Sequence, residues 1–181
     1  MAFLQVITRT FLKRPGLLAE HEKSLAALSD PDWEQTLVVD DAGRGVAWAN
    51  ANLATVPATG EWVWVLDDDD LCVKGDLVET LKRLGAEREC GVIVMRATHV
   101  AYTILPHDNN WGVRPTLTDC GYSNFFIRGE AWNRHRAKFR ELDCYAADHA
   151  FYAHVWDQGE RFHWHDAIAA HYPVRSIGRP E

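Results

Sequence analysis

The sequence predicts an α/β fold: one domain with a mostly parallel central sheet flanked by helices. Three observations lead to this prediction. Short apolar runs of strand length alternate with amphipathic stretches of helical length in the first half of the chain. Two of the apolar runs end directly in aspartates, and open α/β sheets bind ligands at such strand ends. The length of 181 residues suits one domain, 1–181, which we divide into the halves 1–96 and 97–181.

The elements of the first half follow in a regular order. Strands are predicted at 3–8, 35–39, 61–66 and 91–95. Helices are predicted from Pro15 to a break at Asp30-Pro31-Asp32, at 46–53 and at 75–86. The run at 35–39 (QTLVV) has the continuous apolar character of a buried parallel strand.

The second half is less regular. Residues 98–121 are rich in Pro, Asp, Asn and Gly, which predicts a long connection over the sheet, and long ordered loops are usually functional. A strand at 123–128, a helix at 147–158 and a strand at 161–165 are expected to follow.

Composition excludes several classes of protein. The net charge of −7 argues against a nucleic-acid-binding protein, which usually has a basic face. No apolar run reaches the length of a transmembrane span, and the first residues do not have the pattern of a signal peptide. The four cysteines are widely scattered and fit neither a disulfide framework nor a metal-binding pair. We therefore expect free, buried thiols and a cytoplasmic location.

The most informative motif is the run Asp67–Asp70, which directly follows the predicted strand at 61–66. Four adjacent carboxylates repel one another, so a compensating cation is expected, and oxygen ligands suit Mg²⁺ or Mn²⁺. Alternation along an extended backbone would place Asp67 and Asp69 on the same side. The alternative is a solvated acidic turn.

A second strand ends in carboxylates at Asp40 and Asp41. A carboxylate at this position can accept hydrogen bonds from a ribose or from the N–H of a base. Asp is also common in turns after strands, so this motif alone is weak. A parallel sheet would place it near the first cluster of aspartates.

Taken together, these motifs resemble a known family. The order is TRTFLKRP at 8–15, VVDD at 38–41, Gly45 and Asn50 in a helix, and LDDDDL at 66–71. It is similar to the family 2 glycosyltransferases, which have the Rossmann-like GT-A fold. The similarity is close over residues 1–85 and loose beyond. It implies transfer of a sugar from a nucleotide-diphosphate sugar, with a UDP-sugar as the expected donor, to a hydroxyl acceptor of unknown identity.

The resemblance also implies a donor site in the first half of the chain. The second aspartate of VVDD, Asp41, would contact the base, and Asp68 would lie near the ribose. Asp67 and Asp69 would form the metal-binding D-x-D motif for Mn²⁺ or Mg²⁺. The full set of expected nucleotide-sugar contacts is Thr8, Arg9, Thr10, Asp40, Asp41, Arg44, Asn50, Asp67 and Asp68.

The second half would supply the acceptor site and the catalysis. Asp148 opens the predicted helix at 147–158, where the family carries the base that accepts the proton of the acceptor hydroxyl in an inverting transfer. The alternative is an aspartate that caps the helix. Near the C-terminus, His171 is a candidate metal ligand, and Arg175 is a candidate phosphate contact. Trp111 could stack on a sugar or anchor its loop.

Two other functions fit parts of the same pattern. A nucleotidyltransferase of similar topology would need a glycine-rich loop after the first strand, but residues 8–15 contain no glycine. A non-catalytic nucleotide- or sugar-binding domain would have the same fold, although the aspartates argue against it. The resemblance therefore favours a metal-dependent glycosyltransferase over both alternatives.

Overall fold

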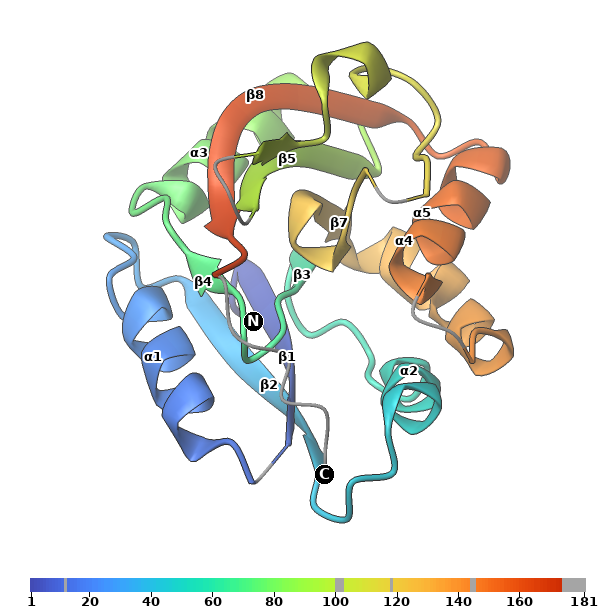
Figure 1. Ribbon diagram of the computed structural model, residues 1–181. Coiled ribbons are helices and arrows are strands. Elements are labelled where there is room, and N and C mark those ends of the chain that lie inside the picture. The colour runs from blue at the N-terminus through green and yellow to red at the C-terminus, as the bar shows by residue number, and fades with distance from the viewer. Residues whose placement is uncertain (12, 100–102, 118, 144–145, 174–181) are drawn as a thin grey trace.

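The computed structural model describes residues 1–11, 13–99, 103–117, 119–143 and 146–173. One curled sheet runs through it, with helices on both faces (Figure 1). The strands are β1 (Leu4–Phe11), β2 (Trp33–Asp40), β3 (Trp62–Val65), β4 (Leu71–Cys72), β5 (Val92–His99), β6 (Thr103–Leu105), β7 (Phe125–Arg128) and β8 (Phe162–His171). The helices are α1 (Pro15–Leu25), α2 (Val46–Leu53), α3 (Leu77–Glu87), α4 (Gly129–His135) and α5 (Ala147–Asp157), with short 3₁₀ turns at η2 (Asp108–Asn110), η3 (Tyr122–Asn124) and η4 (Arg136–Glu141).

The α/β class is confirmed, but the expectation of a mostly parallel sheet is wrong. The strand order is β2-β1-β3-β7-β5-β8-β4, with β6 paired to β5. The pairs β1–β2, β1–β3 and β5–β8 are parallel, whereas β3–β7, β5–β7, β5–β6 and β4–β8 are antiparallel. A parallel return needs a long crossover, usually through a helix. In its described part, the connection from β5 to β7 contains only β6 and short turns, so β7 enters the sheet from the opposite end.

The first half of the chain agrees closely with the predicted elements. Helix α2 has the predicted bounds, and α1 begins at Pro15 as expected. The expected full burial of β2 is wrong: this strand lies at the sheet edge, and Leu37 is 42% exposed. The short strands β4 and β6 and helix α4 were not predicted. Two- and three-residue strands depend on tertiary pairing more than on local pattern.

The sheet separates two hydrophobic cores. Leu25 of α1 and Leu81 of α3 pack against Trp64 on one face, and Trp132 of α4 and Phe151 of α5 fill the other. Figure 1 shows α1 and α3 on one side of the sheet and α2, α4 and α5 on the other. Cys72, Cys90 and Cys120 are buried free thiols, as expected, whereas Cys144 lies outside the described residues.

The first three strands end at one edge of the sheet. Phe11 at the end of β1 pairs with Asp40 at the end of β2. After β3, the chain stays beside β1, since the backbone N–H of Asp68 donates to the carbonyl of Arg9 at 3.1 Å. Both aspartate motifs therefore follow strands that end at this edge. None of the helices within the described ranges is long and apolar enough to cross a membrane.

Gly60 is required by a close approach of two backbone segments. A Cβ at this position would lie 2.7 Å from the amide nitrogen of Gln5 and 2.9 Å from the carbonyl oxygen of Trp62. We expect Gly60→Ala to lower the free energy of unfolding by about 2–3 kcal/mol, because backbone atoms must move. Gly16→Ala is the matched control: a Cβ there has no neighbour within 4 Å, and alanine favours the helix. Urea unfolding measures both, and equal stabilities would contradict the expectation.

Candidate active site

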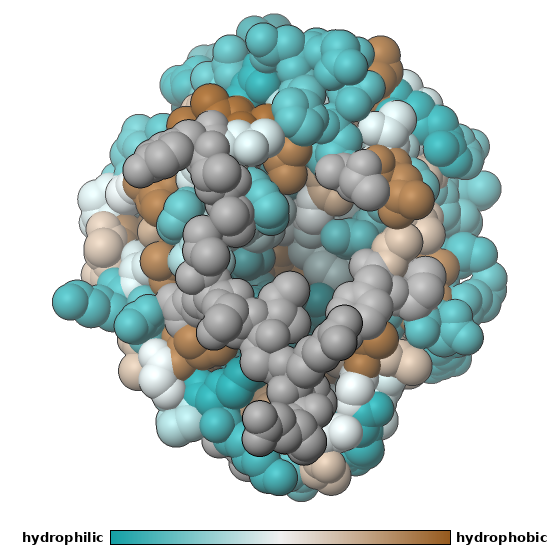
Figure 2. Space-filling view, in the orientation of Figure 1, coloured by the Kyte–Doolittle hydropathy of each residue, from teal (hydrophilic) through white to brown (hydrophobic). Residues whose placement is uncertain are grey.

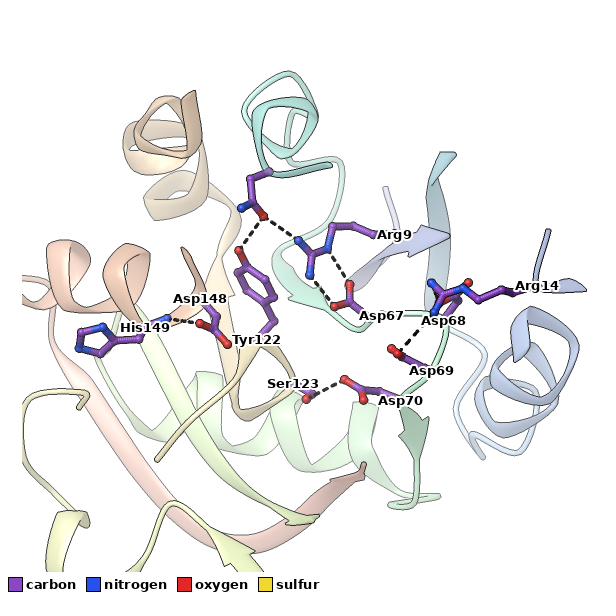
Figure 3. A network of polar contacts seen from close by, with 11 residues as sticks. Arg9, Arg14, Asp67, Asp68, Asp69, Asp70, Tyr122, Ser123, Asp148 and His149 are labelled. Atoms are coloured by element: carbon purple, nitrogen blue, oxygen red, sulfur yellow. Dashed lines mark hydrogen bonds and ion pairs between the residues drawn. The ribbon is translucent and has the colours of Figure 1, made fainter. Parts of the chain in front are cut away.

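A cavity of about 270 Å³ lies beside the aspartate-bearing end of β3. It is lined by Arg9, Val46, Asn50, Asp67, Asp69, Asp70, Gly121, Tyr122, Asp148 and Tyr172. Five residues predicted from the sequence for a donor, metal or catalytic role thus meet in one place, although they come from β1, α2, the segment after β3, and α5. Figure 2 shows a mostly hydrophilic face with a hollow near its centre, and Figure 3 shows the polar contacts at this site.

Arg9 makes the strongest contacts in the cavity. Its Nε and Nη2 donate to the two oxygens of Asp67 at 2.7 and 2.5 Å, and its Nη1 donates to Asn50 at 2.7 Å (Figure 3). The guanidinium also lies 4.5 Å from the ring centre of Tyr122. Burial alone would lower the pKa of Arg9, but the ion pair with Asp67 raises it above its usual value. Arg9 is therefore a fixed cation in an otherwise acidic site.

The four aspartates form a turn rather than an extended segment. The backbone N–H of Asp70 donates to the carbonyl of Asp67 at 3.0 Å. The carboxylates of Asp67, Asp69 and Asp70 consequently line the cavity, while Asp68 lies apart from it. The expected neighbourhood of Asp67 and Asp69 is present, but a turn and not strand alternation produces it.

Asp68 binds the loop that follows β1. It is 1% exposed and accepts hydrogen bonds from Thr10 Oγ1 at 2.8 Å, from the Phe11 N–H at 3.4 Å and from Arg14 Nη2 at 2.9 Å. Burial raises its pKa. In this arrangement Thr10 and Asp68 hold the loop to the aspartate turn, and neither lines the cavity in which a donor contact was expected.

The carboxylates of Asp69 and Asp70 have different surroundings. The Asp69 side chain is 47% exposed, and its ion-pair partner Arg14 is 3.7 Å away, beyond hydrogen-bond distance. Asp70 is buried and accepts a hydrogen bond from Ser123 Oγ at 3.2 Å. Burial and neighbouring carboxylates raise the pKa of both groups. The Asp69 carboxylate is therefore more accessible to a ligand than that of Asp70.

Asp148 is the second residue of α5, and Ala146 occupies the N-cap. The Asp148 Oδ1 accepts the N–H of His149 at 2.7 Å, while burial raises its pKa to about 6. A Cβ added to Gly121 would lie 3.6 Å from Asp148 Oδ2, so the backbone passes close to this second oxygen. Asp148 is thus a partly buried carboxylate in the cavity wall, and it is not the N-cap residue.

The carboxylates at the end of β2 lie outside the cavity lining. Asp40 is buried and accepts the N–H groups of Ala42 at 3.2 Å and Gly45 at 3.0 Å, which organises the turn before α2. Burial raises the pKa of Asp40, but these hydrogen bonds outweigh it and the net shift is downward. Asp41 is exposed and pairs with Arg44 at 2.5 Å. Asp41 and Arg44 remain available to a ligand at the strand end.

Two other predicted residues also lie outside the cavity lining. Thr8 is fully buried, 3.0 Å from His21 Nε2, and accepts a hydrogen bond from Gln35. The Nδ1 of His171 lies 2.8 Å from Thr98 Oγ1. Within the described ranges, no three His, Cys, Asp or Glu residues are grouped so that they could hold a metal ion. Arg175 lies outside the described residues.

Gly121, Tyr122 and Tyr172 line the cavity but were not predicted as site residues. Gly121 has a φ of −119°, which any residue adopts, so its glycine identity reflects space rather than backbone strain. A Cβ at this position would lie 2.5 Å from the Tyr172 hydroxyl, which itself donates to Asn124 at 3.2 Å. The only available signal in the sequence was an aromatic residue next to a glycine in a polar connection.

Comparison with solved structures identifies the fold. No family model matches the sequence, and no curated protein matches it. The crystal structure of S. aureus TarS 1–349 superposes with a TM-score of 0.74 at 16% identity, over 93% of this chain and 60% of that chain. This chain has the fold of TarS, a family 2 glycosyltransferase.

Two further TarS structures support the same assignment of the fold. The complex of TarS 1–349 with UDP gives a TM-score of 0.72 at 16% identity, over 93% of this chain and 60% of that chain. The complex with UDP-GlcNAc gives 0.69 at 15% identity, over 96% and 59%. The chain thus spans about 60% of the length of these TarS chains. The GT-A-like fold expected from the sequence is confirmed.

The ion pair of Arg9 with Asp67 is expected to stabilise the protein. Both side chains are mostly buried, 15% and 24% exposed, so removing the cation leaves Asp67 close to other carboxylates. We expect Arg9→Gln to lower the free energy of unfolding by about 3 kcal/mol. Arg114→Gln is the control, because Arg114 and Asp157 form the same bidentate pair at the surface, where about 0.5 kcal/mol is expected. Equal losses in urea unfolding would contradict this role.

Proposed function

We propose that the chain transfers a sugar from a nucleotide-diphosphate sugar, with UDP as the nucleotide, to a hydroxyl acceptor. The observation on which the proposal rests is the partly buried carboxylate of Asp148, with a pKa of about 6, in one cavity with Asp67 and Asp69. The shared fold adds support, since TarS has been crystallised with UDP and with UDP-GlcNAc. The activity of this chain is inferred from the site, and the fold alone does not determine it.

Asp148 is assigned the role of general base. Its ionised carboxylate accepts the proton of the acceptor hydroxyl while the hydroxyl oxygen attacks the anomeric carbon of the donor. The bond from that carbon to the phosphate oxygen breaks, and the nucleoside diphosphate leaves with the bonding electrons. Attack from the face opposite the leaving group gives inversion. A carboxylate with a pKa near 6 is mostly ionised at neutral pH yet more basic than an exposed aspartate.

The carboxylates of Asp67 and Asp69 are oxygen ligands of the kind that suits Mg²⁺ or Mn²⁺. Magnesium commonly binds one or two protein carboxylates and completes its shell with phosphates and water. Asp69 would hold the ion through its half-exposed carboxylate, with Asp67 beside it. A divalent cation held by Asp69 would supply positive charge beside the leaving diphosphate. Arg9 holds Asp67 through both oxygens, and His171 bonds to Thr98, so we assign the main ligand role to Asp69.

The nucleoside is assigned to the end of β2. Asp41 is exposed there and can accept an N–H of the base. The Arg44 Cζ lies 3.9 Å from the ring centre of Trp48, and the guanidinium pairs with Asp41. In this proposal, 1–96 binds the donor and 97–181 provides the base and the acceptor site.

Substitution of Asp148 tests the assignment of the base. We expect Asp148→Asn to bind UDP with unchanged affinity but to transfer sugar about 10²–10⁴-fold more slowly, because the amide cannot accept the proton. The Asn side chain can still accept the N–H of His149, so the melting temperature should change little. Steady-state turnover and calorimetry with UDP provide the measurements. Turnover close to that of the unsubstituted protein would remove Asp148 from the mechanism.

The dependence of kcat on pH tests the role of Asp148 independently. Because the base acts in its ionised form and its pKa is raised to about 6, kcat should fall as the pH decreases through about 6. The residual turnover of Asp148→Asn should lack this acidic limb. A limb that persists in the variant would belong to another group.

The metal assignment is tested at Asp69. We expect Asp69→Asn to lose most of the increase in UDP affinity that Mn²⁺ produces, because a charged oxygen ligand is removed. Asp76→Asn is the control, since Asp76 is an exposed carboxylate paired with Lys74 outside the cavity. Calorimetric titrations of UDP with and without Mn²⁺ measure both variants. An unchanged Mn²⁺ effect in Asp69→Asn would refute the assignment.

A further inference from the structure

We propose that an acceptor sugar binds in a second, open groove, and that this groove selects neutral or amino-bearing rings over anionic ones. The proposal rests on the glycosyltransferase function proposed above and specifies the acceptor class. The groove has a volume of about 810 Å³. Its walls come from β5, β6, β8 and the start of η2, and they include Arg96, Ile104, His107, Asp108, Asp166 and Ile168.

Arg96 is held in the groove wall by three hydrogen bonds. Its Nε donates to Asp166 at 2.5 Å, its Nη1 to the carbonyl of Pro106 at 2.7 Å and its Nη2 to Asp108 at 2.8 Å. The guanidinium also lies 4.2 Å from the ring centre of Trp111, which packs edge-on against Trp164. Trp111 therefore anchors its loop and supports Arg96. All three nitrogens of the Arg96 guanidinium thus donate to protein oxygens.

The two carboxylates that hold Arg96 are open to solvent. The side chains of Asp108 and Asp166 are 92% and 71% exposed. Each bonds to Arg96 through Oδ1, and among the described residues the Oδ2 of each has no hydrogen-bond partner. Two carboxylates face one guanidinium, so these three groups together have a net charge of −1.

His107 adds a further polar group to the groove. Its Nδ1 bonds to the buried carboxylate of Asp119, which also accepts the His107 backbone N–H at 3.1 Å. An ionised carboxylate only accepts, so the Nδ1 of His107 carries a hydrogen and the ring turns its Nε2 away from Asp119. No described residue bonds to Nε2, and the side chain is half-exposed in the groove wall.

This inventory of groups indicates the ligand chemistry. The groove presents two carboxylate oxygens, which are acceptors, and an imidazole nitrogen beside the exposed aliphatic side chains of Ile104 and Ile168. A sugar ring matches this surface, with hydroxyl or ammonium donors at its edge and C–H groups on its face. A phosphate or carboxylate would meet the like charge of Asp108 and Asp166, and the described lining of the groove offers no Lys or Arg other than the paired Arg96, which costs binding free energy.

The groove is close to the proposed base. Asp119 holds His107 in the groove wall, and Gly121, two residues further along, passes beside Asp148 Oδ2. Two residues of chain span at most about 7 Å. The Trp111 ring beside Arg96 packs against Trp164, which in turn packs against the core cluster that contains Phe151 of α5. An acceptor of a few sugar units can therefore extend from this groove toward Asp148.

The test uses three probes that share one pyranose ring: glucosamine, glucose and glucuronate. NMR titrations at a pH where the amine is protonated should show glucosamine binding about tenfold more tightly than glucuronate, with glucose between them. In Asp108→Asn/Asp166→Asn this preference should disappear, while UDP affinity remains unchanged. Glu89→Gln is the control, because Glu89 is an 88% exposed carboxylate that pairs with Arg161 away from the groove.

The outcomes separate this proposal from the proposed function. Equal binding of glucuronate, unchanged glucosamine binding in the double variant, or no binding of any probe would overturn the groove assignment. If the double variant does not fold, Asp108→Asn alone decides, since that side chain is almost fully exposed. Failure of UDP to bind the unsubstituted protein would instead refute the glycosyltransferase proposal, even if the sugars still bind the groove.

Discussion

The crowding of four carboxylates after β3 is the constraint on which the rest of the site depends. Like charges this close raise the free energy of the folded state unless cations or hydrogen-bond donors compensate. Arg9 compensates from the cavity side through Asp67, and Arg14 compensates from the opposite side through Asp68. The two arginines lie in β1 and just before α1, so the strand-to-helix connection is bound to the aspartate turn. Asp69 remains the least compensated of the exposed members and is open to a further cation.

The antiparallel entry of β7 brings the second half of the chain to this turn. Because β7 pairs between β3 and β5, the residues just before it lie at the edge where β3 ends. Gly121 and Tyr122 reach the cavity in this way, and Ser123 reaches Asp70. Helix α5 then presents Asp148 from the opposite wall (Figure 3). The departure from a mostly parallel sheet is thus the feature that closes the site.

Sequence reasoning was most successful where local pattern and chemistry coincide. Apolar strands that run into aspartates predicted the right edge of the sheet, and Asp67, Asp69 and Asp148 meet there. The sequence alone does not show which way adjacent identical side chains point. The side chains of Asp67 and Asp68 point to different surroundings because tertiary contacts fix the turn that contains them. Thr8 shows the same limit, since its hydroxyl bonds to His21 in the interior. Gly121 was not predicted because glycine is needed there to leave space for the hydroxyl of Tyr172, a residue distant in sequence. The roles assigned to these residues stay predictions.

The burial of Asp68 has a consequence for protein engineering. Its carboxylate accepts bonds from Thr10, Phe11 and Arg14, so the segment after β1 and the turn after β3 form one interlocked unit. A loop transplanted from another protein of this fold would lose these hydrogen-bond donors and leave a buried carboxylate without partners. Chimeras that replace this loop should therefore exchange both segments together. Recombination points chosen between residues 14 and 68 would separate parts that depend on each other for their shape.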